Sequence, residues 1–149
     1  MPRPYQAAGF RLDGPLENGD ISYYTAAAVT ILKGQAIHDN GSGLATNAVT
    51  ALAATFLGIA LEDCASGAVC PVIKPSFKNS FWVPNASATV AAATDVGEIV
   101  DLEAAGSIDV TDNTLVAWGF IVDEIDISAA ALSANAGGYV KGRFSPQPQ

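Results

Sequence analysis

Side chains that perform chemistry are scarce in this sequence. It has one histidine, His38, and two cysteines, Cys64 and Cys70, in 149 residues. The C-x5-C spacing matches neither a zinc motif nor a thioredoxin motif, and two cysteines are too few for a disulfide scaffold. We interpret the cysteines as two small buried hydrophobic residues, with a disulfide that closes a tight loop as the alternative.

Catalytic motifs are also absent. There is no P-loop or G-x-G-x-x-G run, and no G-x-S-x-G elbow that would give His38 a serine nucleophile, so we expect a structural or solvent-exposed His38. The acidic pairs Glu62-Asp63 and Asp123-Glu124 lack the spacing of a calcium loop. We interpret them as solvated strand ends, not as the two carboxylates of a glycosidase. We expect no catalytic residue, no metal site and no cofactor, and predict that the protein is not an enzyme.

Positive charge is sparse. Fifteen acids face seven bases, for a formal net charge of −8, and nine of the acids lie between Asp95 and Asp126 with no base among them. Binding to DNA or RNA through counterion release needs clustered Lys and Arg, so we expect neither a nucleic acid nor an anionic membrane as partner. The bases near the two ends of the chain are the better candidates for contact with a negatively charged partner: Arg3, Arg11, Lys141 and Arg143.

Long hydrophobic runs are missing as well, although half of the residues are apolar. No run reaches the length of about 18 residues that a membrane-spanning helix needs. The first residues, Met-Pro-Arg-Pro-Tyr, contain no apolar signal-peptide region, so we expect synthesis in a cytoplasm.

Short apolar runs separated by Gly, Asn, Asp, Ser and Pro predict a single β-rich domain over residues 29–144. Two alanine-rich stretches, Ser87–Ala93 and Ser128–Ala136, are candidates for short helices. The expected strands are Val29–Lys33, Ala36–Asp39, Phe56–Asp63, Val69–Lys74, Ser80–Val83, Glu98–Leu102, Leu115–Glu124 and Gly138–Phe144.

The two ends of the chain differ from this pattern. Residues 1–28 hold three of the eight prolines and scattered aromatic residues, which favours an extended N-terminal arm. Such an arm packs on its own domain or reaches a neighbouring subunit or partner. Residues 145–149 (Ser-Pro-Gln-Pro-Gln) are expected to form a flexible tail.

The sequence carries a loose internal duplication. Gly34 begins G-Q-A-I-H-D and Gly97 begins G-E-I-V-D-L; a second glycine follows 24 residues later in one copy, at Gly58, and 22 residues later in the other, at Gly119. Each second glycine precedes an apolar strand and an acidic pair. We expect an all-β fold, a β-barrel or β-sandwich of the β-tulip or jelly-roll kind, built from two related halves. Gly58 and Gly119 should mark bulges or close backbone approaches.

These same residues resemble a known family. Lys33-Gly34 with Q-A-I, then L-G-I-A-L-E-D-C-A-S-G, G-E-I-V-D-L and W-G-F-I-V-D-E-I-D over residues 57–126, are similar to the capsid decoration, or cement, proteins of tailed bacteriophages. The resemblance covers roughly residues 29–143 and leaves out the N-terminal arm and the tail. Its motifs are compositional as much as positional.

The resemblance implies a viral structural protein on the outer surface of the mature phage head, made in the bacterial cytoplasm. It implies binding to the major capsid protein, stabilisation of contacts between capsomers, and self-association, with a homotrimer favoured and a dimer as the alternative. An arm of such a protein adds a strand to the capsid protein or to a neighbour. The residues expected to contact the capsid are Arg3, Pro4, Tyr5, Phe10 and Arg11.

Two other functions remain open on the sequence alone. One is a different virion module, such as a head-fibre base or a tail component. The other is a carbohydrate-binding surface module, because Phe77, Phe81 and Trp82 lie close together and an exposed aromatic strip binds sugars. Alternating aromatic residues more often belong to a core.

Overall fold

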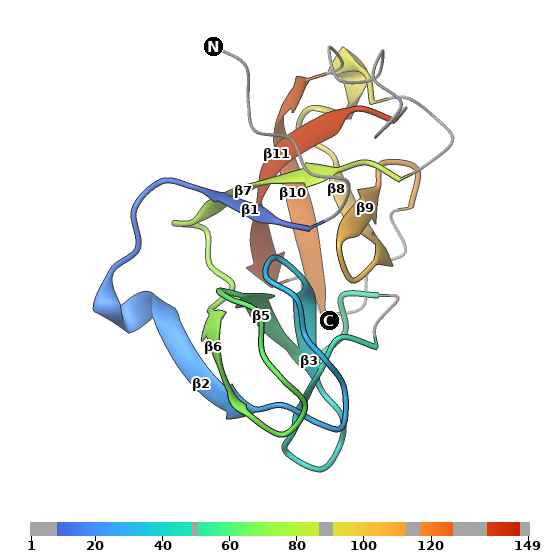
Figure 1. The fold of residues 1–149 in the computed structure, drawn as a ribbon. Helices are drawn as coiled ribbons and strands as arrows, with labels where there is room; N and C mark the ends of the chain where they lie inside the picture. Colours follow the sequence, from blue (N-terminus) through green and yellow to red (C-terminus); the bar gives the residue numbers. More distant parts are fainter. Residues whose placement is uncertain (1–8, 49–50, 87–90, 113–116, 127–136, 147–149) are drawn as a thin grey trace.

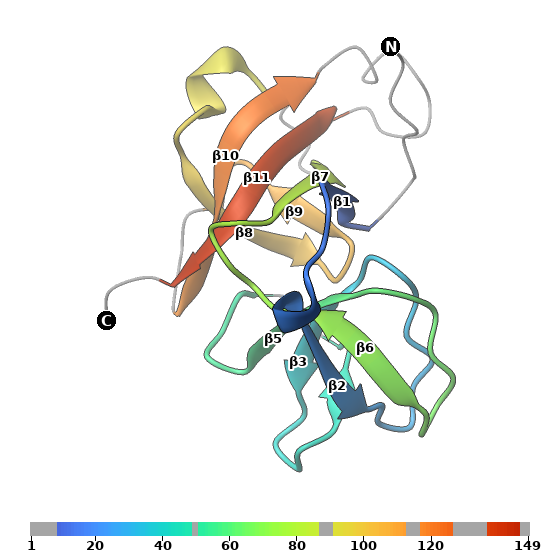
Figure 2. The same ribbon diagram turned by 90° about the vertical axis from the view of Figure 1, so that its left-hand side faces the viewer.

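The computed structural model describes residues 9–48, 51–86, 91–112, 117–126 and 137–146. These residues form two antiparallel β-sheets and two short 3-10 turns (Figures 1 and 2). The larger sheet has the strand order β1-β7-β11-β10-β8-β9 and lies in the upper part of Figure 1; the smaller sheet, with the order β2-β6-β5-β3-β4, lies below it. The predicted all-β fold is confirmed, as an open sandwich of two sheets.

Most strands lie where the apolar runs predict them. The larger sheet comprises β1 (Arg11–Asp13), β7 (Ser80–Pro84), β8 (Ile99–Ala104), β9 (Ser107–Asp109), β10 (Trp118–Asp126) and β11 (Tyr139–Pro146). The smaller sheet comprises β2 (Ile21–Thr25), β3 (Ala36–Asp39), β4 (Ala45–Thr46), β5 (Phe56–Ala60) and β6 (Val69–Ile73). The 3-10 turns are η1 (Asn18–Asp20) and η2 (Ala93–Asp95).

The predicted duplication is confirmed by the topology. Strands β2 to β6 build the smaller sheet, and strands β7 to β11 follow the same order in the larger one. In each half the first strand lies beside the fifth, and across the sheet from there lie the fourth, the second and the third. The third strand of each half is also bridged by the residue that follows the first strand, Ala26 to Ala45 and Asn85 to Ile108. Strand β1, which pairs with β7, is the one described strand outside the repeat.

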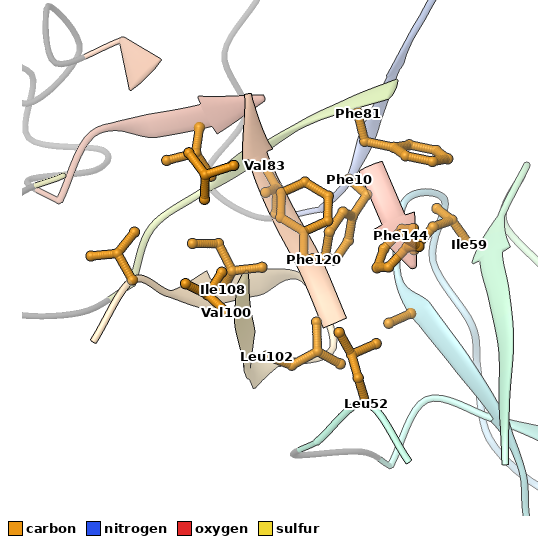
Figure 3. Packing of buried hydrophobic residues seen from close by; sticks show 14 of the residues in the cluster. Phe10, Leu52, Ile59, Phe81, Val83, Val100, Leu102, Ile108, Phe120 and Phe144 are labelled. Carbon is orange, nitrogen blue, oxygen red and sulfur yellow. The ribbon is translucent and has the colours of Figure 1, made fainter. Parts of the chain in front are cut away.

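Aromatic rings fill the space between the two sheets (Figure 3). Phe144 of β11 contacts four other rings, with centroid distances of 5.3 Å to Phe10, 4.8 Å to Phe56, 5.6 Å to Phe81 and 5.1 Å to Phe120. Phe56 belongs to the smaller sheet, and Phe81 and Phe120 to the larger one. Offset and edge-on ring pairs of this kind stabilise a core beyond the burial of their area.

Residues 9–28 of the N-terminal segment belong to the sandwich, which agrees with the alternative in which the arm packs on its own domain and removes the boundary expected after residue 28. Gly9 N–H donates to the carbonyl oxygen of Gly106 at 2.6 Å, and Phe10 N–H donates to that of Gly34 at 2.7 Å. Phe10 therefore enters the core from between the sheets, and β1 and β2 follow it into one sheet each. Both strands lie among prolines and polar residues and therefore form no distinct apolar run in the sequence.

The other expected boundaries also change. Strand β11 continues past Phe144, because Ser145 and Pro146 pair with the first residues of β10; only residues 147–149 of the expected tail lie outside the described chain. The expected helix Ser128–Ala136 lies outside the described residues too. Of the expected helix Ser87–Ala93, Ala92 is extended and Ala93 begins η2, so these described residues form no α-helix.

A second apolar cluster covers the outer face of the smaller sheet. It contains Cys64 and Cys70, which form a disulfide bond, so the alternative interpretation of the two cysteines is the correct one. Ile31 exchanges two backbone hydrogen bonds with Cys64, of 2.9 and 2.8 Å, and holds the preceding loop on the sheet. The expected strand Val29–Lys33 is reduced to this single bridge. Both faces of the smaller sheet are thus buried over much of their area.

Gly58 marks a close backbone approach, as predicted. Its φ is +136°, and a Cβ atom there would lie 2.0 Å from the carbonyl oxygen of Ile73 on β6. The register of β3 against β5 shifts beside it, between Ile37 and His38. Gly119 does not mark a bulge: it pairs regularly with Ser145, and the shift in β10 falls between Val122 and Glu124 instead.

The substitution Gly58→Ala should lower the free energy of unfolding by about 3 kcal/mol, because the new methyl group overlaps backbone and the residue keeps a positive φ. Urea denaturation followed by fluorescence measures this. The matched control is Gly19→Ala, where a Cβ atom has open space around it. Equal effects of the two substitutions would contradict the close approach.

The substitution Phe10→Ala should lower the free energy of unfolding by about 3–5 kcal/mol, because Phe10 is 3% exposed and its ring packs on three others. Phe77→Ala removes a ring of the same size that is 52% exposed, and should cost less than about 1 kcal/mol. A Phe10→Ala protein as stable as Phe77→Ala would show that the N-terminal segment does not anchor the sandwich.

Candidate interaction surface

Of the residues predicted to contact a capsid, only Phe10 and Arg11 are described, and their side chains point in opposite directions. Arg3, Pro4 and Tyr5 lie outside the described residues, so their role stays a prediction. Arg11 lies half-exposed on β1, at the outer edge of the larger sheet. Phe10 is buried among the core rings and is not available to a partner. The sequence shows an aromatic residue near basic ones, but it does not show that Phe10 faces the opposite way from Arg11.

Ion pairs cross the outer face of the larger sheet beside β1. Lys141 of β11 lies 2.8 Å from Asp13 of β1 and 3.2 Å from Glu124 of β10, and these two acids raise its pKa, Asp13 first. An exposed ion pair contributes little stability by itself. This group of one lysine and two acids spans three strands, however, and fixes the side-chain positions around β1.

Arg143 lies on the same face as Lys141. It donates to both carboxylate oxygens of Asp123, at 2.8 and 3.0 Å, and stacks over the ring of Phe77 at 5.1 Å. Two of the four bases proposed for contact with a negative partner, Lys141 and Arg143, are therefore already paired within the chain. Arg11 has no acidic partner within 4 Å among the described residues, which leaves it as the cation at the β1 edge.

The acidic pairs and the aromatic run have structural roles. Asp123 and Glu124 hold Arg143 and Lys141 at the bulge of β10, and Asp63 accepts a hydrogen bond of 2.7 Å from the Lys33 amide. Phe81 is fully buried in the core and Trp82 is buried on the opposite face, so the aromatic run does not form an exposed sugar-binding strip.

His38 lies at a hollow of about 450 Å³ at the open end of the smaller sheet, lined also by Asp39, Asn40, Thr46, Ala51 and Thr55. Its side chain is 3% exposed. Nε2 lies 2.9 Å from the carbonyl oxygen of Ala51, so Nε2 carries the proton and donates it. Nδ1 is buried without a hydrogen-bond partner among the described residues. Desolvation by burial lowers the pKa of His38 to about 4.

The loop after β4 is held from both sheets at adjacent residues. While His38 bonds Ala51, the Oδ1 atom of Asp101 on β8 accepts from the Leu52 amide at 2.7 Å and from its own neighbour Leu102 at 2.7 Å. Burial raises the pKa of Asp101. These bonds press Leu52, which is fully buried, into the core, so both buried titratable groups serve the fold.

The described residues contain no group of three or more His, Cys, Asp or Glu side chains arranged to hold a metal ion. No helix within the described ranges is long and apolar enough to cross a membrane. Neither a protein-family model nor a curated protein matches this chain. Geometry therefore defines the candidate site: an outer strand, β1, is anchored to the core through Phe10 and carries Arg11, which has no acidic partner within 4 Å in the described ranges.

The substitution His38→Gln should remove part of the loss of stability in acid. Between pH 6.5 and about 4 the unfolded chain binds a proton on His38 that the folded chain does not, so stability falls as the pH falls through this window. The penalty approaches the order of 3 kcal/mol near pH 4. Gln keeps an Nε2–H donor for Ala51 and does not titrate.

Urea denaturation of both proteins from pH 7 to pH 4 measures the difference. Asp101 and the other carboxyl groups titrate in both proteins, so their contribution cancels. A parallel pH dependence of the two proteins would contradict the burial of His38.

Proposed function

We propose that this chain is a capsid decoration protein, a non-enzymatic component of the virion. It binds the major capsid protein on the outer surface of a mature phage head and stabilises the contacts between capsomers. It needs no cofactor and no nucleic acid for this role.

The observation that supports the proposal best is the anchoring of the N-terminal segment. Phe10 is fixed among the core rings, and Gly9 and Phe10 are hydrogen-bonded to the β8–β9 hairpin and to the turn before β3, respectively. β1 is the outermost strand of the larger sheet and carries Arg11, for which the described part of the chain offers no acidic partner. Gly9 and Phe10, which follow Arg3, Pro4 and Tyr5 in the sequence, are thus fixed beside an open strand edge. An edge of this kind accepts an extended segment of another protein through main-chain hydrogen bonds.

The charge of the chain supports a protein partner at this edge. The net charge is −8, yet the three residues of β1 are neutral in sum, since Arg11 and Asp13 balance. Approach to a mixed protein surface is therefore less opposed at β1 than over the acidic stretch from Asp95 to Asp126. A capsid presents the same site many times, so a modest affinity at each copy is enough to coat it densely.

Co-sedimentation with expanded, undecorated heads of the phage that encodes the chain tests the proposal. Saturable binding is expected, with a copy number that matches one set of local symmetry axes. The double substitution Arg3→Ala and Tyr5→Ala should weaken binding at least tenfold, because it removes a charge and a ring that are predicted to contact the capsid while leaving Phe10 in the core.

The matched control is Phe77→Ala, which removes an exposed ring from the connection between β6 and β7. It should bind heads like the wild type. Absence of saturable binding by the folded wild-type protein would overturn the proposed function, and equal binding by all three proteins would overturn the role of the N-terminal residues.

A further inference from the structure

The two halves of the duplication differ at one edge. In the larger sheet the first strand of the repeat, β7, is covered by β1. In the smaller sheet the equivalent strand is β2, which pairs with β6 on one side and with no other strand of the described chain on its other side (Figure 1). The repeat therefore leaves room for one further strand beside β2.

The backbone of β2 presents its free groups in a regular order. Asp20 O accepts from Lys74 N–H at 2.7 Å and Ala26 N–H donates to Ala68 O at 2.8 Å, and antiparallel pairs alternate with a period of two residues. Ser22 and Tyr24 therefore bond to β6. The N–H and C=O groups of Ile21, Tyr23 and Thr25 point away from the sheet, and none of them has a backbone partner among the described residues.

The β2 edge lacks the devices that normally prevent strands from pairing. Its sequence Ile-Ser-Tyr-Tyr-Thr has no charged residue, no proline and no bulge, and Tyr23 is 69% exposed. The other outer strands differ from β2. β1 carries two charged residues, and β4 and β9 are partly covered, because Ala26 bridges to Ala45 of β4 and Asn85 bridges to Ile108 of β9. β2 is thus the one described edge that is both open and uncharged.

We propose that β2 pairs with β2 of a second copy of this chain, antiparallel and centred on Tyr23. In this register Tyr23 faces its own counterpart and Ile21 faces Thr25 of the other copy. The three outward-facing residues then form three hydrogen-bonded pairs, or about six new hydrogen bonds across the interface. The exposed Tyr23 rings become a cross-strand aromatic pair, and the two smaller sheets join into one continuous sheet.

The charges near β2 favour this partner and this direction. Glu17, Asp20 and Lys78 form an ion-paired group at the start of β2, whereas Ala26 and Ala27 follow its end. An antiparallel pair sets the charged end of one copy against the neutral end of the other. A parallel pair would place the two acidic groups together. The chain carries a net charge of −8, so two copies meet with least repulsion at a neutral edge.

Strand pairing of two identical edges closes after two copies. The proposal therefore favours the dimer over the homotrimer that the family resemblance implies. It does not depend on capsid binding, and it is tested on the purified chain alone.

The mass in solution, measured by light scattering after size exclusion over a dilution series, is the first test. The wild type should have twice the mass of the chain, and Tyr23→Lys should have the mass of one chain, because it sets two like charges directly opposite each other. Val96→Lys adds the same charge at another exposed apolar residue and should remain dimeric. Thermal unfolding verifies that each variant is folded.

Amide hydrogen exchange supplies the second test, which identifies the edge. The amides of Ile21, Tyr23 and Thr25 should exchange slowly in the wild type and fast in Tyr23→Lys, while those of Ser22 and Tyr24 stay slow in both. A monomeric or trimeric wild type, a dimeric Tyr23→Lys, or fast exchange at the three amides in a dimer would each overturn the proposal.

Discussion

The packing of aromatic rings between the two sheets is the interaction on which the structure depends. Each sheet has one apolar inner face that only the other sheet covers, and Phe144 contacts rings from both sheets and from the N-terminal segment. Besides these rings, the two sheets are joined by the aliphatic side chains of the same cluster, by the backbone bonds of residues 9, 10 and 36 and by the loop at Leu52. The position of β1, and with it the candidate capsid-binding edge, follows from the seating of Phe10 in this cluster.

Much of the sandwich could be predicted from the sequence, because alternation along a strand is visible wherever the strand is long enough. β3 has the predicted bounds, β5, β6, β7, β8, β10 and β11 fall within a few residues of theirs, and the duplication appears in the topology. β1 and β2 could not be predicted, since they lie among prolines and polar residues and gain their order from pairing with β7 and β6. The disulfide also depends on tertiary structure, because the sequence does not show that the chain between Cys64 and Cys70 turns back and brings the two sulfur atoms together.

The candidate surface was harder to predict than the fold, because a sequence lists charges without their partners. Lys141 and Arg143 look available in the sequence, yet both are paired with acids from neighbouring strands. Nothing in the sequence marks Asp13 as a partner of Lys141, yet the two side chains pair across the strand that lies between theirs. Tyr23 was one of several scattered aromatic residues, and only the direction of the β2 backbone and its exposure distinguish it from the buried Phe10.

The backbone bonds of Gly9 and Phe10 also define a geometric limit. They fix the point at which the chain departs from the sandwich, between the hairpin at Gly106 and the turn at Gly34. A fully extended chain covers at most about 3.5 Å per residue, so Tyr5 lies within about 14 Å of Gly9 in every conformation. Any surface that Tyr5 touches must come that close to the seam between the sheets. For the proposed capsid contact, this covalent limit sets the greatest distance between the sandwich and the capsid surface that binds Tyr5.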